Sequence, residues 1–265
     1  MTTVGVIGVG YLGECLAEGL AASQTPLVLS PRNAERVNSL ADRFGCEIAA
    51  SNYDVVERSD LVFLATRPTD IAATAAGLPW RDGQRAISIA AGIGLESFAA
   101  AVSPALAIRA MPIASCRICE SPTAFCPDDS MTASILEKIG SAHPFPDEAQ
   151  FKTASIFGAF YALSYAFLDE VSGWAETNGL EPVAGRQLSA RMVQAAAAAV
   201  LDRSDRAPGE LLNDLMTPGG ITEKGLKVLE ESQALKRWSE ALDASAAHSL
   251  AIETSAIQSK NPGEK

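Results

Sequence analysis

The chain has 265 residues, of which 48% are hydrophobic and 20% charged, so it can bury a large core and is not expected to be intrinsically disordered. Acidic residues outnumber basic ones by 32 to 21, and the net charge of −11 argues against nucleic acid or an anionic membrane as a partner. There is no run of about eighteen apolar residues and no basic leader, so the sequence predicts a cytoplasmic protein that acts on small molecules.

The five cysteines are an odd number at irregular spacing, which is not typical of a disulfide framework, so we expect reduced thiols. Cys116 and Cys119, with Cys126 nearby, could be half of a zinc site or a redox pair. A structural zinc site needs four ligands, however, and the only histidines, His143 and His248, are not at ligand spacing from these cysteines. We therefore predict ordinary core or loop cysteines and no metal.

The first 110 residues alternate short β-branched runs with helical stretches, a pattern typical of a parallel sheet covered by helices on both faces. The strand-like runs are continuously apolar, as expected for strands that are buried on both sides. The predicted strands are 4–7, 26–30, 46–49, 61–65, 85–89 and 106–109, and the predicted helices are 11–23, 34–44, 54–58, 68–76 and 95–101.

From about residue 151 the apolar residues lie three and four apart and no strand is convincing, which indicates a helical second half. We predict a long helix over 151–178 that ends at Gly179, and a helix over 182–201 that begins with Pro182. A break at 207–209 precedes a short helix, the turn 217–220 and one or two last helices over 221–257. We expect 259–265 to be disordered.

A G-x-G-x-x-G segment follows the first predicted strand directly and opens the first predicted helix. In this context Gly8 allows a tight turn, Gly10 lets the backbone approach a pyrophosphate, and Gly13 lets helix and strand pack closely. Free N–H groups and the positive end of the helix dipole then face the phosphates. The alternative is a glycine-rich turn that binds no ligand. The candidate cofactor-binding residues of this segment are Gly8, Val9, Gly10, Tyr11 and Leu12.

These features together predict an α/β protein. We expect an N-terminal Rossmann-type dinucleotide-binding domain over residues 1–148, followed by an all-helical C-terminal domain over 149–265.

The residues at the end of the second predicted strand indicate whether the adenosine ribose carries a 2′-hydroxyl, as in NAD, or a 2′-phosphate, as in NADP. NAD enzymes usually carry an acidic residue there, whereas this chain has Ser30, Arg32 and Asn33 and no carboxylate. Arg32 can pair with a 2′-phosphate, and Ser30 and Asn33 can donate hydrogen bonds to it, so the sequence favours NADP. Alternatively Arg32 is a solvated loop residue, and NAD and NADP would then be accepted similarly.

Several segments taken together resemble pyrroline-5-carboxylate reductases, which reduce a cyclic imine with NAD(P)H in proline synthesis. In order and spacing they extend over about residues 4 to 230. The segments are the glycine motif, Asn52, the stretch 59–68, the stretch 88–93, the stretch 108–112 and the stretch 217–222.

The resemblance implies roles for particular residues. Asn52 would contact the adenosine ribose, Met111 and Pro112 would lie by the nicotinamide, and the glycine turn 217–220 would hold the substrate carboxylate. The residues that would line the dinucleotide are Ala65, Thr66, Arg67, Pro68, Ala90, Ala91 and Gly92. The residues that would line the substrate are Met111, Pro112, Thr217, Gly219, Gly220 and Thr222, the last as a candidate for positioning it during catalysis.

The chemistry of the glycine turn agrees with that role. Gly219 and Gly220 can expose consecutive backbone N–H groups at the start of a helix, which is an anion-binding arrangement. Thr217 and Thr222 add hydroxyl donors. The alternative is a plain connection between two helices.

The chain departs from the family's pattern on the substrate side. Ile113, Ala114 and Ser115 stand where the family has Asn-Thr-Pro, and the aromatic stretch 157–163 replaces a Ser-Gly-Ser-Gly-Pro-Ala-Tyr run. Ile221 replaces a threonine. The cofactor half therefore matches better than the substrate half, as expected for a relative that acts on another imine or on a carbonyl.

Reduction of a protonated imine mainly requires alignment of the nicotinamide with the C=N carbon, so it needs no catalytic histidine or lysine. We predict hydride transfer from NADPH to a cyclic imino acid, with NAD as a possible second cofactor. The alternatives are a β-hydroxyacid-type dehydrogenase, which would need a positioned acid such as Lys152, and a nucleotide-binding regulatory protein without turnover.

The stretch 194–200 holds five alanines and can bury little area on its own, so it requires close helix packing. Because the resembled family joins two subunits through C-terminal helices, we expect a homodimer in which residues 149–265 serve dimerisation and substrate binding.

Overall fold

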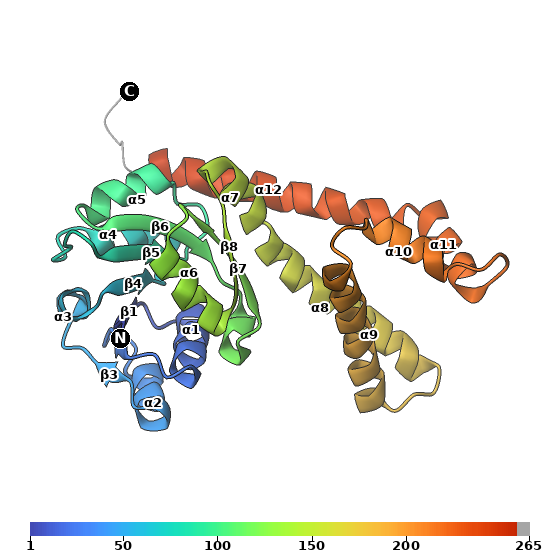
Figure 1. The fold of residues 1–265 in the computed structure, drawn as a ribbon, viewed down its shortest axis with the longest axis horizontal. Coiled ribbons are helices and arrows are strands. Elements are labelled where there is room, and N and C mark those ends of the chain that lie inside the picture. The colour runs from blue at the N-terminus through green and yellow to red at the C-terminus, as the bar shows by residue number, and fades with distance from the viewer. Residues whose placement is uncertain (259–265) are drawn as a thin grey trace. The chain divides into compact units, whose positions relative to one another are not determined.

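The structure, a computed structural model, describes residues 1–258, and the predicted disorder of 259–265 lies outside them. The chain forms two compact units, one of Met1–Gly158 with the last helix from Ala246 onward and one of Ala159–Ser245. Figure 1 labels the elements of both. The predicted domain boundary at residue 149 stays a prediction, because these units reflect packing and not function.

The first unit contains an eight-stranded sheet in the order β3-β2-β1-β4-β5-β6-β7-β8. The first six strands are parallel, β7 runs antiparallel to β6, and β8 runs parallel to β7. This arrangement confirms the predicted α/β class. The strands are β1 Val4–Ile7, β2 Leu27–Leu29, β3 Glu47–Ile48, β4 Leu61–Leu64, β5 Arg85–Ser88, β6 Leu106–Met111, β7 Ser121–Cys126 and β8 Gly140–Pro144.

Helices cover both faces of the sheet, and each face has its own hydrophobic core. Alternate residues of β4 point to opposite faces, so Phe63 packs with Leu16 of α1 while Val62 packs with Val55 of α3 and Phe98 of α5. The helices of this unit are α1 Tyr11–Ala22, α2 Ala34–Phe44, α3 Asn52–Arg58, α4 Ile71–Ala75, α5 Leu95–Val102, α6 Ser130–Leu136 and α7 Glu148–Ser155, and the 3-10 turns are η1 Pro68–Asp70, η2 Ala114–Ile118 and η3 Glu137–Ile139.

The sequence reasoning assigned no element between 111 and 147, where the structure has β7, α6 and β8. The two strands lack a strong strand signal, because β7 begins Ser-Pro and β8 reads Gly-Ser-Ala-His-Pro without a β-branched residue. They form by pairing with the existing sheet edge, with Arg109 opposite Cys126 in the antiparallel register.

The predicted helix over 151–178 is wrong in one respect, because the structure divides it into α7 and α8 Phe157–Thr177. The Ser155 hydroxyl donates to the carbonyl of Lys152 at 2.7 Å, and the Ile156 N–H donates to Thr153 at 3.2 Å, three residues back. Such local bonds tighten and bend a helix. The start at Glu148 is set by Asp147, whose carboxylate accepts from the Gln150 N–H at 2.8 Å.

The second unit is helical, as predicted, and contains most of α8, then α9 Pro182–Asp202, α10 Pro208–Leu215, α11 Ile221–Glu231 and the first part of α12 Ala234–Gln258. Gly179 ends the α8 segment with φ of +93°, as predicted. Gly185 of α9 lies against Ala175 of α8, and Trp238 makes edge contacts with Phe160 and Phe167 at 6.0 and 6.3 Å between ring centroids.

Large apolar side chains are exposed in the second unit, whereas both hydrophobic clusters lie in the first. Within α9, α10 and α11, only Gly185 and Ser189 are buried among the described residues. The most exposed apolar residues of the unit include Trp174, Met192, Leu201, Leu215, Ile221 and Val228.

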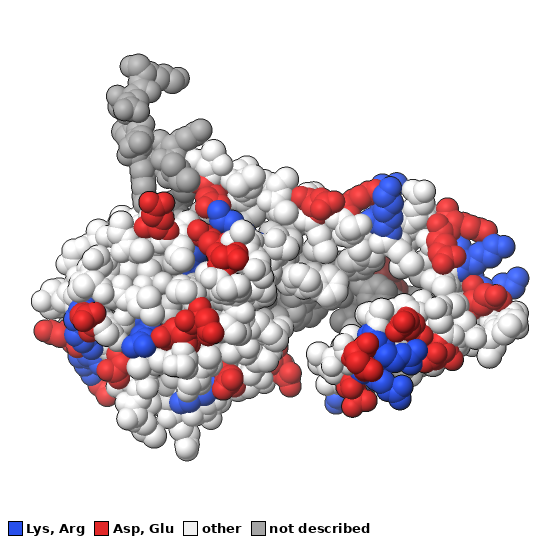
Figure 2. All heavy atoms as spheres, turned by 45° about the horizontal axis from the view of Figure 1, so that its top comes forward, with Lys and Arg blue, Asp and Glu red and all other residues white. Residues whose placement is uncertain are grey.

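No helix among residues 1–258 combines the length and the apolar character needed to cross a bilayer. On the face that Figure 2 shows, lysines and arginines are interspersed with acidic residues and form no continuous basic field.

Candidate functional site

The carboxyl ends of β1 and β4 lie side by side in the sheet, at the point where the strand order reverses. In open α/β sheets this is where ligands bind, in the crevice outside the strand ends. The loop after β1 carries Gly8, and the loop after β4 carries Ala65 and Thr66. The Ala65 N–H donates to the Ile7 carbonyl at 2.8 Å, which joins the two loops at their start.

The three motif glycines differ in the space around them. Gly8 has φ of +94°, and a Cβ there would lie 2.8 Å from Thr66 Cγ2. A Cβ on Gly13 would lie 2.5 Å from the Gly8 carbonyl oxygen, so this position needs glycine for helix–strand contact. A Cβ on Gly10 would meet nothing within 4 Å. The Cβ position of Gly10 therefore faces open space at the start of α1.

The start of α1 supplies the donors for that space. Gly10 is the N-cap and has no side chain to satisfy the first N–H groups of the helix. Val9 is buried and can offer only its backbone, whereas Tyr11 is 62% exposed and lies under the Arg117 guanidinium at 5.8 Å. Leu12 is partly buried against the core.

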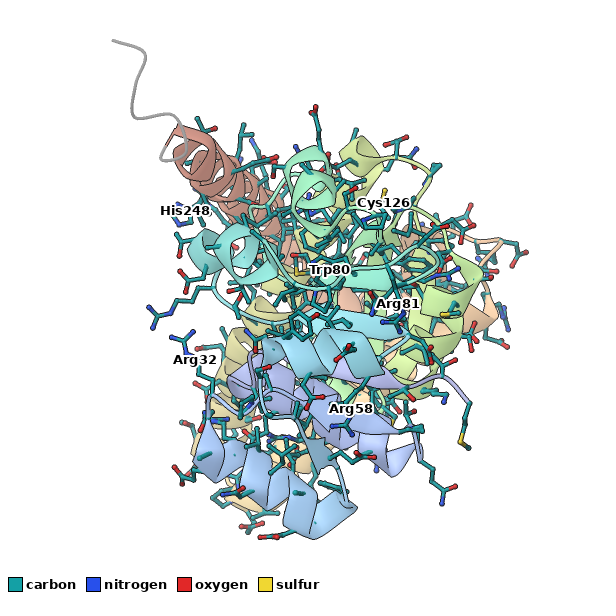
Figure 3. The ribbon with its side chains drawn as sticks, turned by 90° about the vertical axis from the view of Figure 1, so that its left-hand side faces the viewer. Arg32, Arg58, Trp80, Arg81, Cys126 and His248 are labelled. Carbon is teal, nitrogen blue, oxygen red and sulfur yellow. The ribbon has the colours of Figure 1, made fainter. Side chains whose placement is uncertain are left out.

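The polar residues after β2 divide into two groups. Ser30 is 1% exposed and its hydroxyl accepts from the Gly8 N–H at 3.0 Å. The Asn33 side chain caps α2 and donates to the Val9 carbonyl at 3.2 Å. Both thus brace the glycine loop, and their expected bonds to a 2′-phosphate stay predictions. Arg32 is exposed, extends away from the ribbon in Figure 3, and has no ion pair or hydrogen bond within residues 1–258.

The loop after β4 contains a hydroxyl without a partner. Thr66 Oγ1 is buried and makes no hydrogen bond in the described part of the chain, although a buried hydroxyl normally has one. It lies beside Gly8, where it could donate a hydrogen bond to a ligand in the glycine loop. Of its neighbours, Ala65 is partly buried, Arg67 is exposed and Pro68 begins η1.

The loop after β5 is covered by the last helix. Ala90 is buried and Ala91 exposed, and Gly92, with φ of +72°, lies so close to α12 that a Cβ would be 2.6 Å from Ile252 Cγ2. Nearby, Lys152 donates to Glu253 at 2.9 Å. Sequence reasoning missed this return of the chain, because no local pattern marks a contact between residues so far apart.

Met111 ends β6 and is partly buried, and Pro112 follows it buried. Two residues earlier, Arg109 is 3% exposed, donates to Glu148 at 2.8 Å and stacks on Phe151 at 4.7 Å. Glu148 also accepts from the Leu95 N–H at 2.7 Å. This buried ion pair, which the sequence did not single out, holds α5 and α7 beside the end of β6.

The remaining predicted residues lie apart from these loops along the chain. Asn52 is the first residue of α3, after β3. Thr217, Gly219 and Gly220 form the turn before α11, and Thr222 is exposed in its first turn.

The expectation that this turn exposes two free N–H groups is wrong. The Gly220 N–H donates to the Thr217 carbonyl at 2.8 Å, and the Gly219 N–H donates to the carboxylate of Glu223 at 2.6 Å. The signal was present in the sequence, because a glutamate at the third position of a helix commonly reaches back to the backbone before it.

The cysteines are free thiols, four of them buried and Cys119 partly exposed. Burial raises the pKa of the Cys116 thiol to about 12 and also raises those of Cys15, Cys46 and Cys126. Such thiols stay protonated at neutral pH and are poor nucleophiles.

Comparison with known proteins agrees with this geometry. Residues 3–92 match the family model described as NADP oxidoreductase coenzyme F420-dependent, and residues 148–252 match the model of pyrroline-5-carboxylate reductase dimerisation. Pyrroline-5-carboxylate reductase 2 of Bacillus subtilis is 26% identical over 247 residues, 88% of each chain. The Escherichia coli pyrroline-5-carboxylate reductase is 26% identical over 86% of this chain and 90% of its own.

Solved structures give the same result. The Streptococcus pyogenes pyrroline-5-carboxylate reductase has a TM-score of 0.82 at 25% identity, covering 94% of this chain and 98% of its own. These comparisons together support a member of the pyrroline-5-carboxylate reductase family. Its fold is also shared by the NADP-bound Plasmodium falciparum enzyme, with a TM-score of 0.83, 21% identity and coverage of 95% and 98% of the two chains. The imine reductase of a Pseudomonas species has a TM-score of 0.60 and 17% identity, covering 98% of this chain and 94% of its own.

The matches to pyrroline-5-carboxylate reductases confirm the sequence-based resemblance and support the general activity. The chain is an NAD(P)H-dependent reductase of the pyrroline-5-carboxylate reductase type, with a nicotinamide cofactor. Its C-terminal match to the dimerisation model indicates homo-oligomerisation.

Proposed function

We propose that this chain transfers a hydride from NADPH to the C=N carbon of a cyclic imine, either pyrroline-5-carboxylate or a related imine. The observation that carries the proposal is the open space at Gly10 in front of the uncapped start of α1, in a chain whose relatives are pyrroline-5-carboxylate reductases. In this proposal residues 1–148 hold the dinucleotide, and residues 149–265 dimerise and help to bind the substrate.

The residues of the first unit fit a dinucleotide. The first N–H groups of α1 can bind its phosphates, Thr66 has an unpaired buried hydroxyl to donate, and Gly8 and Gly13 keep the loop close to the helix. When bound, NADPH supplies the hydride, and the protein supplies position and environment. The candidate residues stay proposals as a group: Gly8, Val9, Gly10, Tyr11, Leu12, Ser30, Arg32, Asn33, Asn52, Ala65, Thr66, Arg67, Pro68, Ala90, Ala91 and Gly92.

The preference for NADPH over NADH is proposed from Arg32. It is the exposed cation at the end of β2 and it has no acidic partner among residues 1–258. A guanidinium can bind a 2′-phosphate through two charge-assisted hydrogen bonds. Glu14 of α1 is already paired with Arg36.

Reduction of a protonated imine needs no acidic or basic side chain for proton transfer in the hydride step. A protonated imine is electrophilic before it binds, so the protein must mainly hold its carbon at the distance and angle for transfer. Reduction of a ketone would instead need an acid for the developing alkoxide. Lys152 is one residue that this alternative could use, and its ammonium group is paired with Glu253 at 2.9 Å. This pairing favours the imine over the β-hydroxyacid alternative.

A homodimer through the second unit is part of the proposal. The unit exposes Leu201, Leu215 and Ile221 at 78%, 72% and 93%, and it contains neither of the two hydrophobic clusters. Exposed apolar side chains of this size are unfavourable in water, and burial against a second chain would remove that cost. Sedimentation at micromolar concentration should give the mass of two chains, and a single-chain mass would contradict the dimer.

The activity is tested by following NADPH oxidation with a panel of cyclic imines, β-keto acids and buffer alone, together with calorimetric titration of NADPH. Turnover with imines only supports the proposal. Turnover with keto acids only would establish the dehydrogenase alternative. Binding of NADPH without turnover of any compound would indicate a regulatory protein.

A further inference from the structure

The loop after β5 starts beside the two loops of the candidate nucleotide site. The Ile89 N–H donates to the Leu64 carbonyl at 3.2 Å. The next residue of that loop, Ala65, donates its N–H to the Ile7 carbonyl at 2.8 Å. The loops after β1, β4 and β5 are therefore hydrogen-bonded in series at the carboxyl edge of the sheet.

This edge has two sides, which meet where the strand order reverses between β1 and β4. The strand β2 and the exposed Arg32 lie on one side, where the adenosine half of a dinucleotide would bind. The strands β5 and β6 lie on the other side, which leaves them for the nicotinamide half. Arg109 of β6 belongs to this edge, because it lies opposite Ser88, the last residue of β5.

One carboxylate oxygen ties the ends of these two strands together. Glu148 Oε1 accepts from Arg109 Nη1 at 2.8 Å and from the Leu95 N–H at 2.7 Å. Leu95 is the first residue of α5, and the N-cap Gly94 has no side chain to accept from that N–H. Glu148 thus caps α5 from another element, α7, and joins the far end of the loop after β5 to the end of β6.

The Arg109 guanidinium keeps this carboxylate in place. Arg109 is buried and forms no other ion pair within residues 1–258, and its Nε has no hydrogen-bond partner there. Phe151, from the same helix as Glu148, stacks on the guanidinium at 4.7 Å. Because a buried cation without a counter-ion is strongly unfavourable, Glu148 is held at Arg109 and offers Leu95 a fixed acceptor.

We propose that Glu148 is a positioning residue for the nicotinamide half of the cofactor, acting through the loop after β5 and the end of β6. The inference rests on the proposed imine reduction and adds a residue to it. A misplacement of about 1 Å can lower a rate about 100-fold, so loosening this loop should impair hydride transfer more than binding. The adenosine half should be unaffected, because Glu148 bonds to neither the loop after β1 nor that after β2.

The sharpest test removes one hydrogen bond and no charge. Leu95→Pro deletes the N–H that Glu148 accepts, and proline is well tolerated at the first position of a helix. Gly94 before it is already extended, with φ of −71° and ψ of 142°, as the residue before a proline should be. Leu95→Ala shortens the same side chain but keeps the N–H, so it is the matched control.

Kinetics and binding of a fragment separate positioning from general damage. In NADPH oxidation with the faster of pyrroline and pyrroline-5-carboxylate, Leu95→Pro should lower kcat at least about tenfold relative to Leu95→Ala. Glu148→Ala, which also leaves Arg109 without a counter-ion, should lower kcat at least as much. Glu96→Ala, at an exposed glutamate of α5, should behave as wild type. The Kd of adenosine 2′,5′-bisphosphate, a probe of the adenosine half, should stay within about twofold in all variants.

The fluorescence of bound NADPH gives a second measurement that does not depend on turnover. It reports on the surroundings of the nicotinamide, and should differ between Leu95→Pro and Leu95→Ala. The inference is overturned if these two variants share the same kcat and fluorescence, or if Leu95→Pro weakens the binding of adenosine 2′,5′-bisphosphate as much as that of NADPH. Wild type that binds NADPH but oxidises it with neither imine would instead refute the proposed function, and the fluorescence comparison would still decide the role of Glu148.

Discussion

The conformation of Gly10 allows a sharp separation of binding from folding. Gly10 has ordinary backbone angles, φ of −83° and ψ of −160°, and a Cβ there would meet nothing within 4 Å. In Gly10→Val the added Cβ therefore enters open space at the start of α1. The protein should fold, with a cost of about 1 kcal/mol from the poorer N-cap, or about 2–4 °C in Tm.

Dinucleotide binding should respond very differently to Gly10→Val. The new side chain keeps a pyrophosphate from reaching the first N–H groups of α1. Hydrogen bonds to a charged group contribute about 1.5–3 kcal/mol each, so the loss of two amounts to about 3–6 kcal/mol. We expect the Kd for NADPH to rise at least about 100-fold. The assays are calorimetric titration of NADPH and thermal unfolding without ligand.

Two further variants serve as controls for Gly10→Val. Gly209→Val also enters open space but lies in α10, so it should leave NADPH binding unchanged. Gly13→Ala should show the opposite pattern, because its Cβ would lie 2.5 Å from the Gly8 carbonyl oxygen and the strain should cost about 1–3 kcal/mol of stability. If Gly10→Val bound NADPH within about threefold of wild type, the placement of the phosphates at α1 would be refuted.

Three other predictions concern single residues. Arg32→Asp should raise the KM for NADPH at least about tenfold while the KM for NADH changes little. Arg203→Asp in the second unit is the charge-matched control. Equal effects on both cofactors would rule out a contact between Arg32 and the 2′-phosphate. Asp129 is pushed by burial toward a higher pKa, but its hydrogen bonds, led by Arg85, hold that pKa below its ordinary value. A carboxyl group whose pKa is lower in the folded than in the unfolded state stabilises the fold at pH values above its unfolded pKa. Asp129→Asn should therefore lower the free energy of unfolding in urea by about 2 kcal/mol at pH 7, and this loss should shrink below about pH 4. A loss that does not change with pH would contradict this. Native protein should react rapidly with a thiol reagent at Cys119 alone, since the other cysteines are buried, and several fast thiols would be inconsistent with the core.

The sequence predicted the dinucleotide half of the fold because the relevant signals are local. The roles of Gly8 and Gly13 follow from backbone geometry within six residues. Helix 34–44 was predicted with its observed bounds, which the structure shows to be capped by Asn33 and ended at Gly45. The break before Phe157 was missed, because it arises from a hydroxyl that bonds back within its own helix.

Long-range features could not be predicted in the same way. The strands β7 and β8 have weak propensity and exist because a sheet edge is available. The contact of Ile252 with Gly92 joins residues far apart in the chain, and only the folded structure shows it. The position of Glu223 at the third residue of α11 was typical of a helix cap, but only the structure shows that its carboxylate accepts the Gly219 N–H.

The central claim is that a hydride passes from NADPH to the carbon of a C=N bond, and isotope transfer tests it most directly. Wild type is incubated with NADPH carrying deuterium at the transferable nicotinamide position and with both pyrroline and pyrroline-5-carboxylate. The account predicts a cyclic amine with one deuterium on the former imine carbon. Binding of NADPH with no deuterium in either amine, or deuterium found only in a hydroxy acid when a keto acid is supplied, would contradict it.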